Sequence, residues 1–328
     1  TIPVGQAAME LHKRPVLVCH APYMRQKLGG AVDVWALDIL ELFAFVHPAV
    51  FCVPTPAGVA KALGLTTPQS PDDAPLVLMD CAKALLGQMA REPRTGKKAD
   101  PLEIARVMGL NGKGWAWTPF IFAAYGEPYD PAQPVIVKTA LNIWKHLPEW
   151  AEGAPPAPPS HHPVTGDEAR TRLKEMLNAG SEDRPQQAEY ATTVTAAFAP
   201  IVREDAPHIV LAEAGTGTGK TLGYLAPASV WAEKNGAPVW ISTYTKNLQR
   251  QVGQELSRLY PDPAMKDKKA VIRKGRENYL CLLNFEDMAA GAALAKYPDQ
   301  VIAAGLMARW AGVSENGDMH GGDFPGWL

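Results

Sequence analysis

One glycine-rich loop constrains this chain more than any other feature, because such a loop joins a strand to a helix. Its residues are Ala214, Gly215, Thr216, Gly217, Thr218, Gly219, Lys220 and Thr221. The general pattern is Gly-x-x-x-x-Gly-Lys-Ser/Thr, and Ala214 stands in place of the first glycine. Small residues let the backbone wrap round phosphate oxygens with its N–H groups pointing inward, and the following helix presents the positive end of its dipole.

The surroundings of the loop match this requirement. The apolar run Ile209–Ala212 precedes it, and a helical pattern follows from Lys220 to Lys234, with the stop signal Asn235-Gly236 behind it. The sequence therefore predicts a site for ATP and Mg²⁺. Lys220 is expected to reach the β- and γ-phosphates, and the Thr221 hydroxyl is expected to bind Mg²⁺, which makes these two the candidate catalytic residues.

Strand and helix patterns alternate through this half of the chain. Strands are predicted at Ile209–Ala212, Pro238–Ser242 and Ala270–Ile272, and helices at Gln186–Val202, Lys220–Lys234 and Lys246–Tyr260. Such alternation favours an α/β fold with a parallel sheet.

Prolines divide the chain into two halves. The run Gly153–Pro163 cannot hold a helix or a central strand, which indicates a stiff linker. The preceding half shows a strand pattern at Pro15–His20 and helical patterns at Asp38–Val46, Leu76–Ala90, Pro101–Met108 and Val135–Leu147. We expect a smaller α/β domain there.

Charge and cysteine content narrow the classes of function. The net charge is −2, yet the segment from Lys246 to Arg276 carries nine Lys or Arg residues against three Asp or Glu residues. Such a local excess is typical of a phosphate-binding surface. Four scattered cysteines without a C-x-x-C pair argue against a disulfide framework. With no signal peptide and no membrane-length apolar run, a cytoplasmic protein is expected.

Four segments together resemble one family. They are Glu213–Thr221, the element Arg184-Pro-Gln-Gln187, the run Trp240–Gln251 and the run Arg273–Cys281. In this order and spacing they are similar to superfamily II DNA helicases of the iron–sulfur branch, typified by bacterial DinG and xeroderma pigmentosum group D helicase. The resemblance implies a RecA-like parallel sheet around the loop.

The resemblance also implies roles for individual residues. Arg184 and Gln187 belong to the element whose glutamine contacts adenine, and an amide can pair with both the donor and the acceptor of that base. The candidate DNA-contacting residues, which suit phosphates, are Thr243, Thr245, Lys246, Asn247 and Gln249. Cys281 matches the first of four cysteines that bind a 4Fe–4S cluster, expected only in a full-length protein.

The implied domain organisation has four parts. Residues 1–150 form a degenerate exonuclease-like domain, 151–165 a Pro-rich linker, 166–275 a partial first RecA-like ATP-binding domain, and 276–328 the start of an iron–sulfur insertion domain. No cysteine follows Cys281, and in the resembled family the other three cluster cysteines come later in that insertion, so we expect Leu328 to fall inside it. The Asp-Glu-x-His box of the family is also absent. The chain alone is then expected to bind ATP but hydrolyse it poorly.

The exonuclease-like half lacks the carboxylates that such enzymes use to hold two metal ions. The opening Asp-x-Glu strand is missing, so we expect no nuclease activity. We also expect no single site to be formed by the remaining candidates, which are Asp33, Asp38, Asp72, Asp73 and Asp80.

The leading hypothesis is an ATP-dependent DNA helicase that moves 5′ to 3′ on single-stranded DNA and acts on forked DNA in repair or replication. Two alternatives stay open, a P-loop ATPase of another class and a nuclease with an accessory ATPase domain. Stimulation of ATP hydrolysis by single-stranded DNA would distinguish the helicase from a P-loop ATPase of another class. The nuclease alternative requires a carboxylate cluster in residues 1–150.

Overall fold

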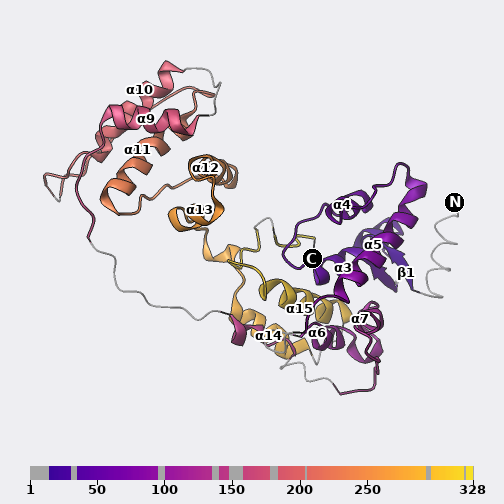
Figure 1. Cartoon of the computed structure of the whole chain (residues 1–328). Coiled ribbons are helices and arrows are strands. Elements are labelled where there is room, and N and C mark those ends of the chain that lie inside the picture. Colours follow the sequence, from indigo (N-terminus) through magenta and orange to yellow (C-terminus); the bar gives the residue numbers. More distant parts are fainter. Residues whose placement is uncertain are drawn as a thin grey trace. The chain divides into compact units, whose positions relative to one another are not determined.

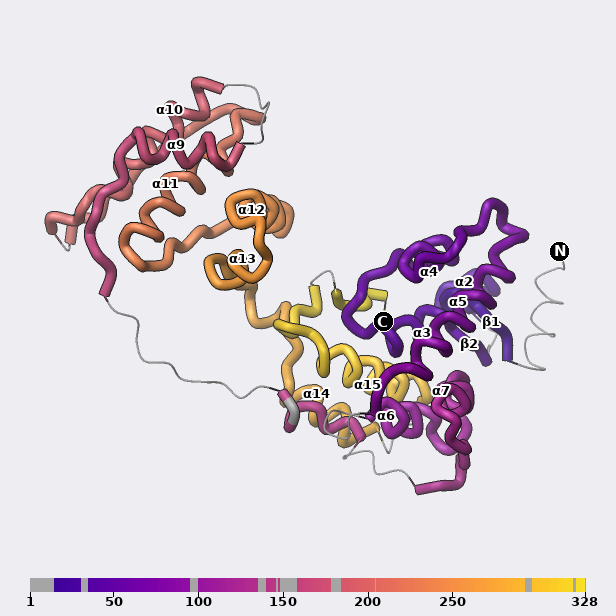
Figure 2. The backbone as a smooth tube through the Cα atoms, viewed as in Figure 1, coloured from indigo at the N-terminus to yellow at the C-terminus, as the bar shows by residue number. Residues whose placement is uncertain are grey.

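The computed structural model describes residues 15–30, 35–94, 100–134, 140–147, 158–177, 184–203, 205–292, 297–320 and 323–327. In these ranges the chain is mostly helical (Figure 1). It divides into two compact units (Figure 2). Unit 1 combines Thr1–Trp150 with Gly275–Leu328, and unit 2 comprises Ala151–Lys274. Among the described helices, none has the length and apolar character needed to cross a membrane.

Unit 1 begins with two short parallel strands. Strand β1 (Val16–Val18) pairs with β2 (Ala36–Asp38) in the register Val16 to Ala36, and helix α2 (Ala21–Lys27) lies between them in the chain. Helix α3 (Ile39–Val46) follows β2 directly. Parallel neighbours require such a crossover connection.

The buried carboxylate of Asp38 joins these elements. Its Oδ1 accepts hydrogen bonds from the backbone N–H groups of Leu40 at 2.8 Å and Glu41 at 3.3 Å, so it caps α3. Its Oδ2 accepts from the N–H of Ala21 at 2.6 Å, at the start of α2. One side chain therefore fixes the N-termini of two helices at the end of β2.

Further helices complete unit 1. Before unit 2 in the chain they are α4 (Pro56–Ala62), η1 (Pro71–Asp73), α5 (Ala74–Met89), α6 (Pro101–Met108), η2 (Leu110–Gly112), α7 (Thr118–Ala124) and η3 (Ile143–His146). After unit 2 come η5 (Arg276–Asn278), α14 (Leu282–Gly291) and α15 (Pro298–Ala311). Both groups contribute to one hydrophobic core, in which Phe43, Leu85, Ile104 and Trp310 are fully buried.

Helix α15 is attached to the earlier part of the chain by Arg309. Its Nε donates to the carbonyl oxygen of Phe45 at 2.9 Å, and its two terminal nitrogens bind the carboxylate of Glu92 at 3.0 and 2.9 Å. Gly305 on the same helix lies against Met108 of α6, and a Cβ at this position would collide with that side chain. The glycine therefore allows α15 to approach α6 closely.

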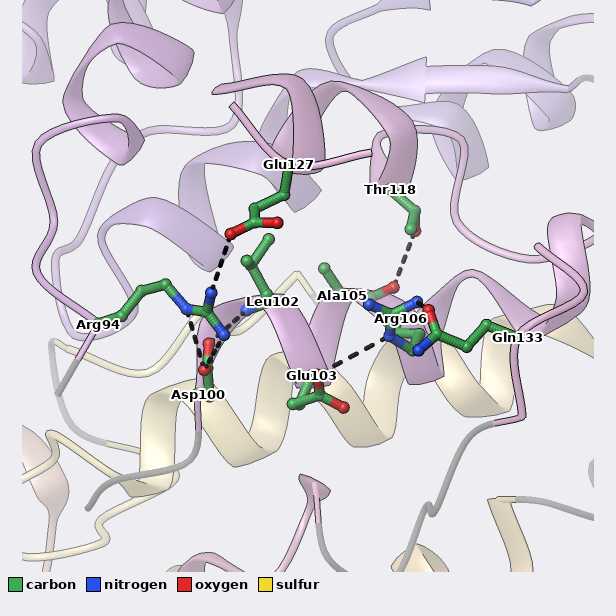
Figure 3. A network of polar contacts seen from close by, with 9 residues as sticks. All are labelled: Arg94, Asp100, Leu102, Glu103, Ala105, Arg106, Thr118, Glu127 and Gln133. Carbon is green, nitrogen blue, oxygen red and sulfur yellow. Dashed lines mark hydrogen bonds and ion pairs between the residues drawn. The ribbon is translucent and has the colours of Figure 1, made fainter. Parts of the chain in front are cut away.

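A polar network holds α6 and α7 in place (Figure 3). Asp100 caps α6 by accepting from the N–H of Leu102 at 2.9 Å, and Arg94 binds the same carboxylate at 2.8 Å. The hydroxyl of Thr118, at the start of α7, donates to the carbonyl oxygen of Ala105 at 2.9 Å. The network satisfies polar groups at the helix ends, which are otherwise left without partners.

Unit 2 is built from helices around a small core. They are α9 (Gly166–Met176), α10 (Pro185–Val194), η4 (Thr195–Phe198), α11 (Lys220–Asn235), α12 (Lys246–Leu259) and α13 (Pro263–Lys269). The C-terminal end of α11 is hydrogen-bonded to the segment that precedes α9, because Oδ1 of Asn235 accepts from the N–H of His162 at 2.7 Å. In the predicted linker, residues 151–157 lie outside the described residues.

The predicted fold class, an α/β chain with a RecA-like parallel sheet and a smaller α/β domain, is wrong. Among the described residues only β1 and β2 form a sheet. The segments 209–212, 238–242 and 270–272 are not strands, and Leu211 and Trp240 are 95% and 81% exposed. An apolar run indicates a tendency to be buried, but a strand exists only when its N–H and C=O groups pair with a neighbouring strand. These three segments have no such pairing.

Most of the predicted helices are present in the structure. Five are confirmed as α3, α5, α6, α11 and α12, and the strand predicted at Pro15–His20 is confirmed as β1. The helix predicted at Gln186–Val202 is confirmed only as far as Val194, where α10 ends. Of the helix predicted at Val135–Leu147, residues 135–139 lie outside the described residues, and Ile143–His146 form the 3₁₀-helix η3.

Two carboxyl groups near the start of α3 have raised pKa values. Burial, followed by the charge of Asp38, raises the pKa of Glu41 to about 8, although the N–H of Trp115 donates to this carboxyl at 2.9 Å. Burial also raises the pKa of Asp38 to about 6, against the lowering effect of its three backbone hydrogen bonds. Both groups therefore hold a proton more tightly in the folded than in the unfolded chain.

This difference predicts a pH dependence of stability. As pH rises from about 4 to about 8, the unfolded chain loses these protons first, so the free energy of unfolding falls. Glu41→Gln should weaken that dependence and make the protein more stable than the wild type at about pH 8, because an amide oxygen still accepts from Trp115. Chemical denaturation at about pH 5 and pH 8 measures both effects.

Glu315→Gln is the matched control for this prediction, because Glu315 is an exposed glutamate of the same unit. It should leave the pH dependence as it is in the wild type. A Glu41→Gln variant with an unchanged dependence would show that Glu41 is not the responsible group.

Candidate nucleotide-binding site

The N-terminus of α11 lies directly behind the glycine-rich loop. Gly219 precedes the helix with φ of +77°, and no side chain caps it. Gly217 also has a left-handed backbone, with φ of +79°. Glycine adopts this conformation without the strain that a Cβ brings. The first N–H groups of α11 thus have no capping side chain and suit an anion.

Lys220, the first residue of α11, folds back over the loop. Its ammonium group donates to the carbonyl oxygens of Ala214 at 2.8 Å and Gly215 at 2.7 Å. The hydroxyl of Thr218 donates to the same Gly215 oxygen at 2.9 Å. These bonds hold the start and the end of the loop together. A lysine has three donors, so one remains for a phosphate oxygen.

Thr221 occupies the next position of α11 and is half-buried. Its side chain lies near that of Tyr224, one turn further along the helix. Burial raises the pKa of the Tyr224 hydroxyl, and the neighbouring Thr221 hydroxyl acts in the opposite direction. The Thr221 hydroxyl thus belongs to the first turn of α11, directly behind the loop.

Helix α10 contacts the loop from a second side. Arg184 donates to the carbonyl oxygen of Gly217 at 3.1 Å, and Nε2 of Gln187 donates to that of Gly219 at 2.8 Å. Gln187 is only 3% exposed, and a Cβ at residue 219 would collide with its amide. The side chain needs the glycine in order to reach the backbone. Arg184 and Gln187 therefore hold the two left-handed glycines of the loop.

Packing between α10 and α11 supports these contacts. The ring of Tyr190 lies against Gly223, where a side chain would collide with it. Ala191 of α10 and Leu222 and Leu225 of α11 are buried in the core of unit 2. The close approach of the two helices places Gln187 next to the loop.

The candidate DNA-contacting residues lie at the start of α12. The Thr245 hydroxyl caps this helix by accepting from the N–H of Leu248 at 3.2 Å. Asn247 accepts from Arg250 at 2.7 Å, and Gln249 donates to the carbonyl oxygen of Arg273 at 3.2 Å. The last bond brings the segment 270–274 alongside α12.

Positive charge is left unneutralised at this place. Lys246, Arg250 and Arg273 are exposed, and none of them forms an ion pair with a described residue. Thr243, which precedes them, is half-buried. We call Lys246, Arg250 and Arg273 the unpaired cations. Their charges are free to attract an anionic ligand.

Cysteines do not assemble into a cluster site. Cys281 is exposed at the start of α14, while burial raises the pKa of Cys19 to about 12 and the pKa values of Cys52 and Cys81 to about 11. A 4Fe–4S cluster needs about four thiolates, and in the described ranges no three His, Cys, Asp or Glu residues lie close enough to share a metal ion. The cysteines that the structure describes therefore do not fit such a cluster.

Three of the candidate carboxylates of unit 1 cap helices or form an ion pair. Asp38 caps α3, Asp73 caps η1, and Asp80 pairs with Lys83 at 3.3 Å. Asp33 lies outside the described residues. In the described ranges, no three His, Cys, Asp or Glu residues lie close enough to hold a metal ion.

The sequence assigned Arg184 and Gln187 to the same predicted site as the loop. It did not predict that their side chains donate hydrogen bonds to the loop carbonyls. A signal was present, because residues three apart lie on one face of a helix. It also missed Tyr190, whose contact with Gly223 has no local sequence signature. Cys281 belongs to unit 1 and Lys246 to unit 2.

Three curated proteins illustrate what the chain resembles. It is 43% identical over 107 residues to ATP-dependent helicase DinG of Mycobacterium tuberculosis. It is 39% identical over 145 residues to ATP-dependent DNA helicase YoaA of Escherichia coli, and 41% identical over 120 residues to 3′-5′ exonuclease DinG of Bacillus subtilis. No protein-family model and no solved structure matches the chain.

These matches cover limited parts of both partners. They span 31%, 43% and 35% of this chain, and 15%, 20% and 12% of the length of the relatives, in the order just given. Over that part, at about 40% identity, the chain is homologous to the DinG and YoaA ATP-dependent DNA helicases, a DinG-like helicase family.

Proposed function

We propose that this chain binds ATP with Mg²⁺ at the loop 214–221 and forms the nucleotide-binding part of an ATP-dependent DNA helicase. The observation that carries the proposal is the uncapped N-terminus of α11, with Lys220 and Thr221 in its first turn. Partial homology to helicases named as ATP-dependent supports it. In this proposal the helicase moves 5′ to 3′ along single-stranded DNA, acts on forks in repair or replication, and is cytoplasmic.

Each residue of the site has a task in the proposal. The loop N–H groups and Lys220 bind the phosphates, and the Thr221 hydroxyl holds Mg²⁺, which neutralises phosphate charge when bound. Gln187 keeps one N–H on the carbonyl of Gly219 and has a second N–H and its oxygen with which to contact adenine. Arg184 supports the loop at Gly217.

The DNA-binding part of the proposal rests on the start of α12. Thr243, Thr245, Lys246, Asn247 and Gln249 supply hydroxyl, ammonium and amide groups, which suit phosphate oxygens and do not depend on base sequence. Charge complementarity supports this assignment, because the unpaired cations lie in the same region. The proposal keeps Cys281 as one ligand of a 4Fe–4S cluster that is expected only in a full-length protein, since the described cysteines do not by themselves fit one.

The first test concerns the phosphates. Lys220→Ala should lower the affinity of the chain for ATP with Mg²⁺ by about 10- to 150-fold, because a charge-assisted hydrogen bond is lost. Isothermal titration calorimetry measures the change. Lys174→Ala, which removes an exposed lysine from α9 of the same unit, is the control and should bind as the wild type does. Equal affinities for all three proteins would rule out this loop as the site.

The second test concerns the base. Gln187→Ala should reduce the preference for ATP over GTP, because loss of paired hydrogen bonds to a base costs about 1–3 kcal/mol. Competition between the two nucleotides measures the preference. Gln186→Ala removes the exposed neighbouring glutamine and is the control. A preference that survives in Gln187→Ala would limit Gln187 to holding the loop.

The third test concerns DNA. Lys246→Ala should weaken binding of single-stranded DNA equally for every sequence and reduce the slope of log affinity against log salt by about 0.7. Fluorescence anisotropy over a series of salt concentrations gives both quantities, with Lys174→Ala again as control. A wild-type chain that binds ATP but no single-stranded DNA would favour a P-loop ATPase of another class.

A further inference from the structure

Tyr244 is the most exposed aromatic residue that the structure describes. It lies two residues before α12, and 99% of its surface is accessible. Tyrosine is usually at least partly buried in a folded chain. Among the described residues of this unit the ring has no packing partner, so it contributes nothing to the core, and an aromatic face is available to a ligand.

The neighbourhood of Tyr244 selects the kind of ligand. Lys246 and Arg250 follow it on α12, and the hydrogen bond from Gln249 to the carbonyl of Arg273 brings a third cation to the same helix. All three are exposed and form no ion pair with a described residue. An exposed ring beside unneutralised cations is complementary to a polyanion that carries flat apolar groups.

Single-stranded DNA has this chemistry. Its phosphates attract cations, and its unpaired bases present free faces that stack on aromatic side chains with little regard to sequence. In a duplex the same faces are covered by neighbouring base pairs. We propose that Tyr244 stacks on a base of single-stranded DNA whose phosphates are bound by the unpaired cations Lys246, Arg250 and Arg273.

This inference rests on the proposed function and adds a residue to it. None of the phosphate-contacting groups named above distinguishes single-stranded from double-stranded DNA, because both carry phosphates. Stacking on Tyr244 makes that distinction, since it requires an uncovered base. The cations then determine the dependence on salt, and the ring determines the preference for single strands.

The test compares three variants of the full chain by fluorescence anisotropy with a labelled oligothymidine. Tyr244→Ala should weaken binding about five- to 150-fold, as expected for loss of one stacked base, with the salt slope unchanged because no charge is removed. Tyr244→Phe should bind as the wild type does, since stacking does not need the hydroxyl. Tyr23→Ala, an exposed tyrosine of unit 1, is the control and should have no effect.

Two further ligands identify the stacking contact itself. An abasic oligonucleotide of the same length should bind equally to wild type and Tyr244→Ala, because it has no base to stack. A duplex should also show no difference between them. Equal weakening of Tyr244→Ala on abasic and normal strands would overturn the inference.

The outcomes separate the inference from the function beneath it. If the wild type binds single-stranded DNA and Lys246→Ala weakens it, but Tyr244→Ala binds normally, the proposed function stands and stacking is refuted. A wild-type chain without affinity for single-stranded DNA would overturn both. Circular dichroism should show that Tyr244→Ala is folded, as expected for a side chain without internal contacts.

Discussion

A buried guanidinium group is costly unless its donors find partners, and in unit 1 Arg309 finds them on two other segments of the chain. It binds the Glu92 carboxylate with two nitrogens, donates to the backbone of Phe45, and lies over the ring of the same residue at 4.9 Å from its centroid. These partners precede the nucleotide loop in sequence, whereas Arg309 follows it. The pairing therefore makes unit 1 discontinuous, and unit 2 becomes an insertion between its two parts.

The loop in unit 2 is held by similar means, through side chains that bind backbone carbonyls. Lys220 bonds to the start of the loop, and Arg184 and Gln187 bond to its later glycines. The left-handed backbone at Gly217 and Gly219 needs glycine, and the contact with Gln187 excludes any larger residue at 219. The carbonyls of Ala214 and Gly215 take two of the three donors of the Lys220 ammonium group, so the third is left for a nucleotide phosphate.

Local patterns in the sequence predicted helices well and strands badly. Helices α3, α6, α11 and α12 form their hydrogen bonds within the segment, so capping residues such as Asp38 and Thr245 and a stop such as Gly236 are enough to mark them. A strand depends on a partner elsewhere in the chain. The apolar segments around Leu211 and Trp240 therefore looked like strands, yet neither pairs with another strand.

The sequence by itself determined the glycine loop, the helix behind it and the local excess of positive charge, because each depends on residues that are neighbours in the chain. It also determined the partial likeness to helicases, which lies in short runs such as Arg184–Gln187. Only the tertiary structure decided that Gln187 holds the carbonyl of Gly219, that Arg309 joins the two parts of unit 1, and that Tyr244 is left uncovered. Contact and exposure depend on how distant segments pack, and no local pattern records that.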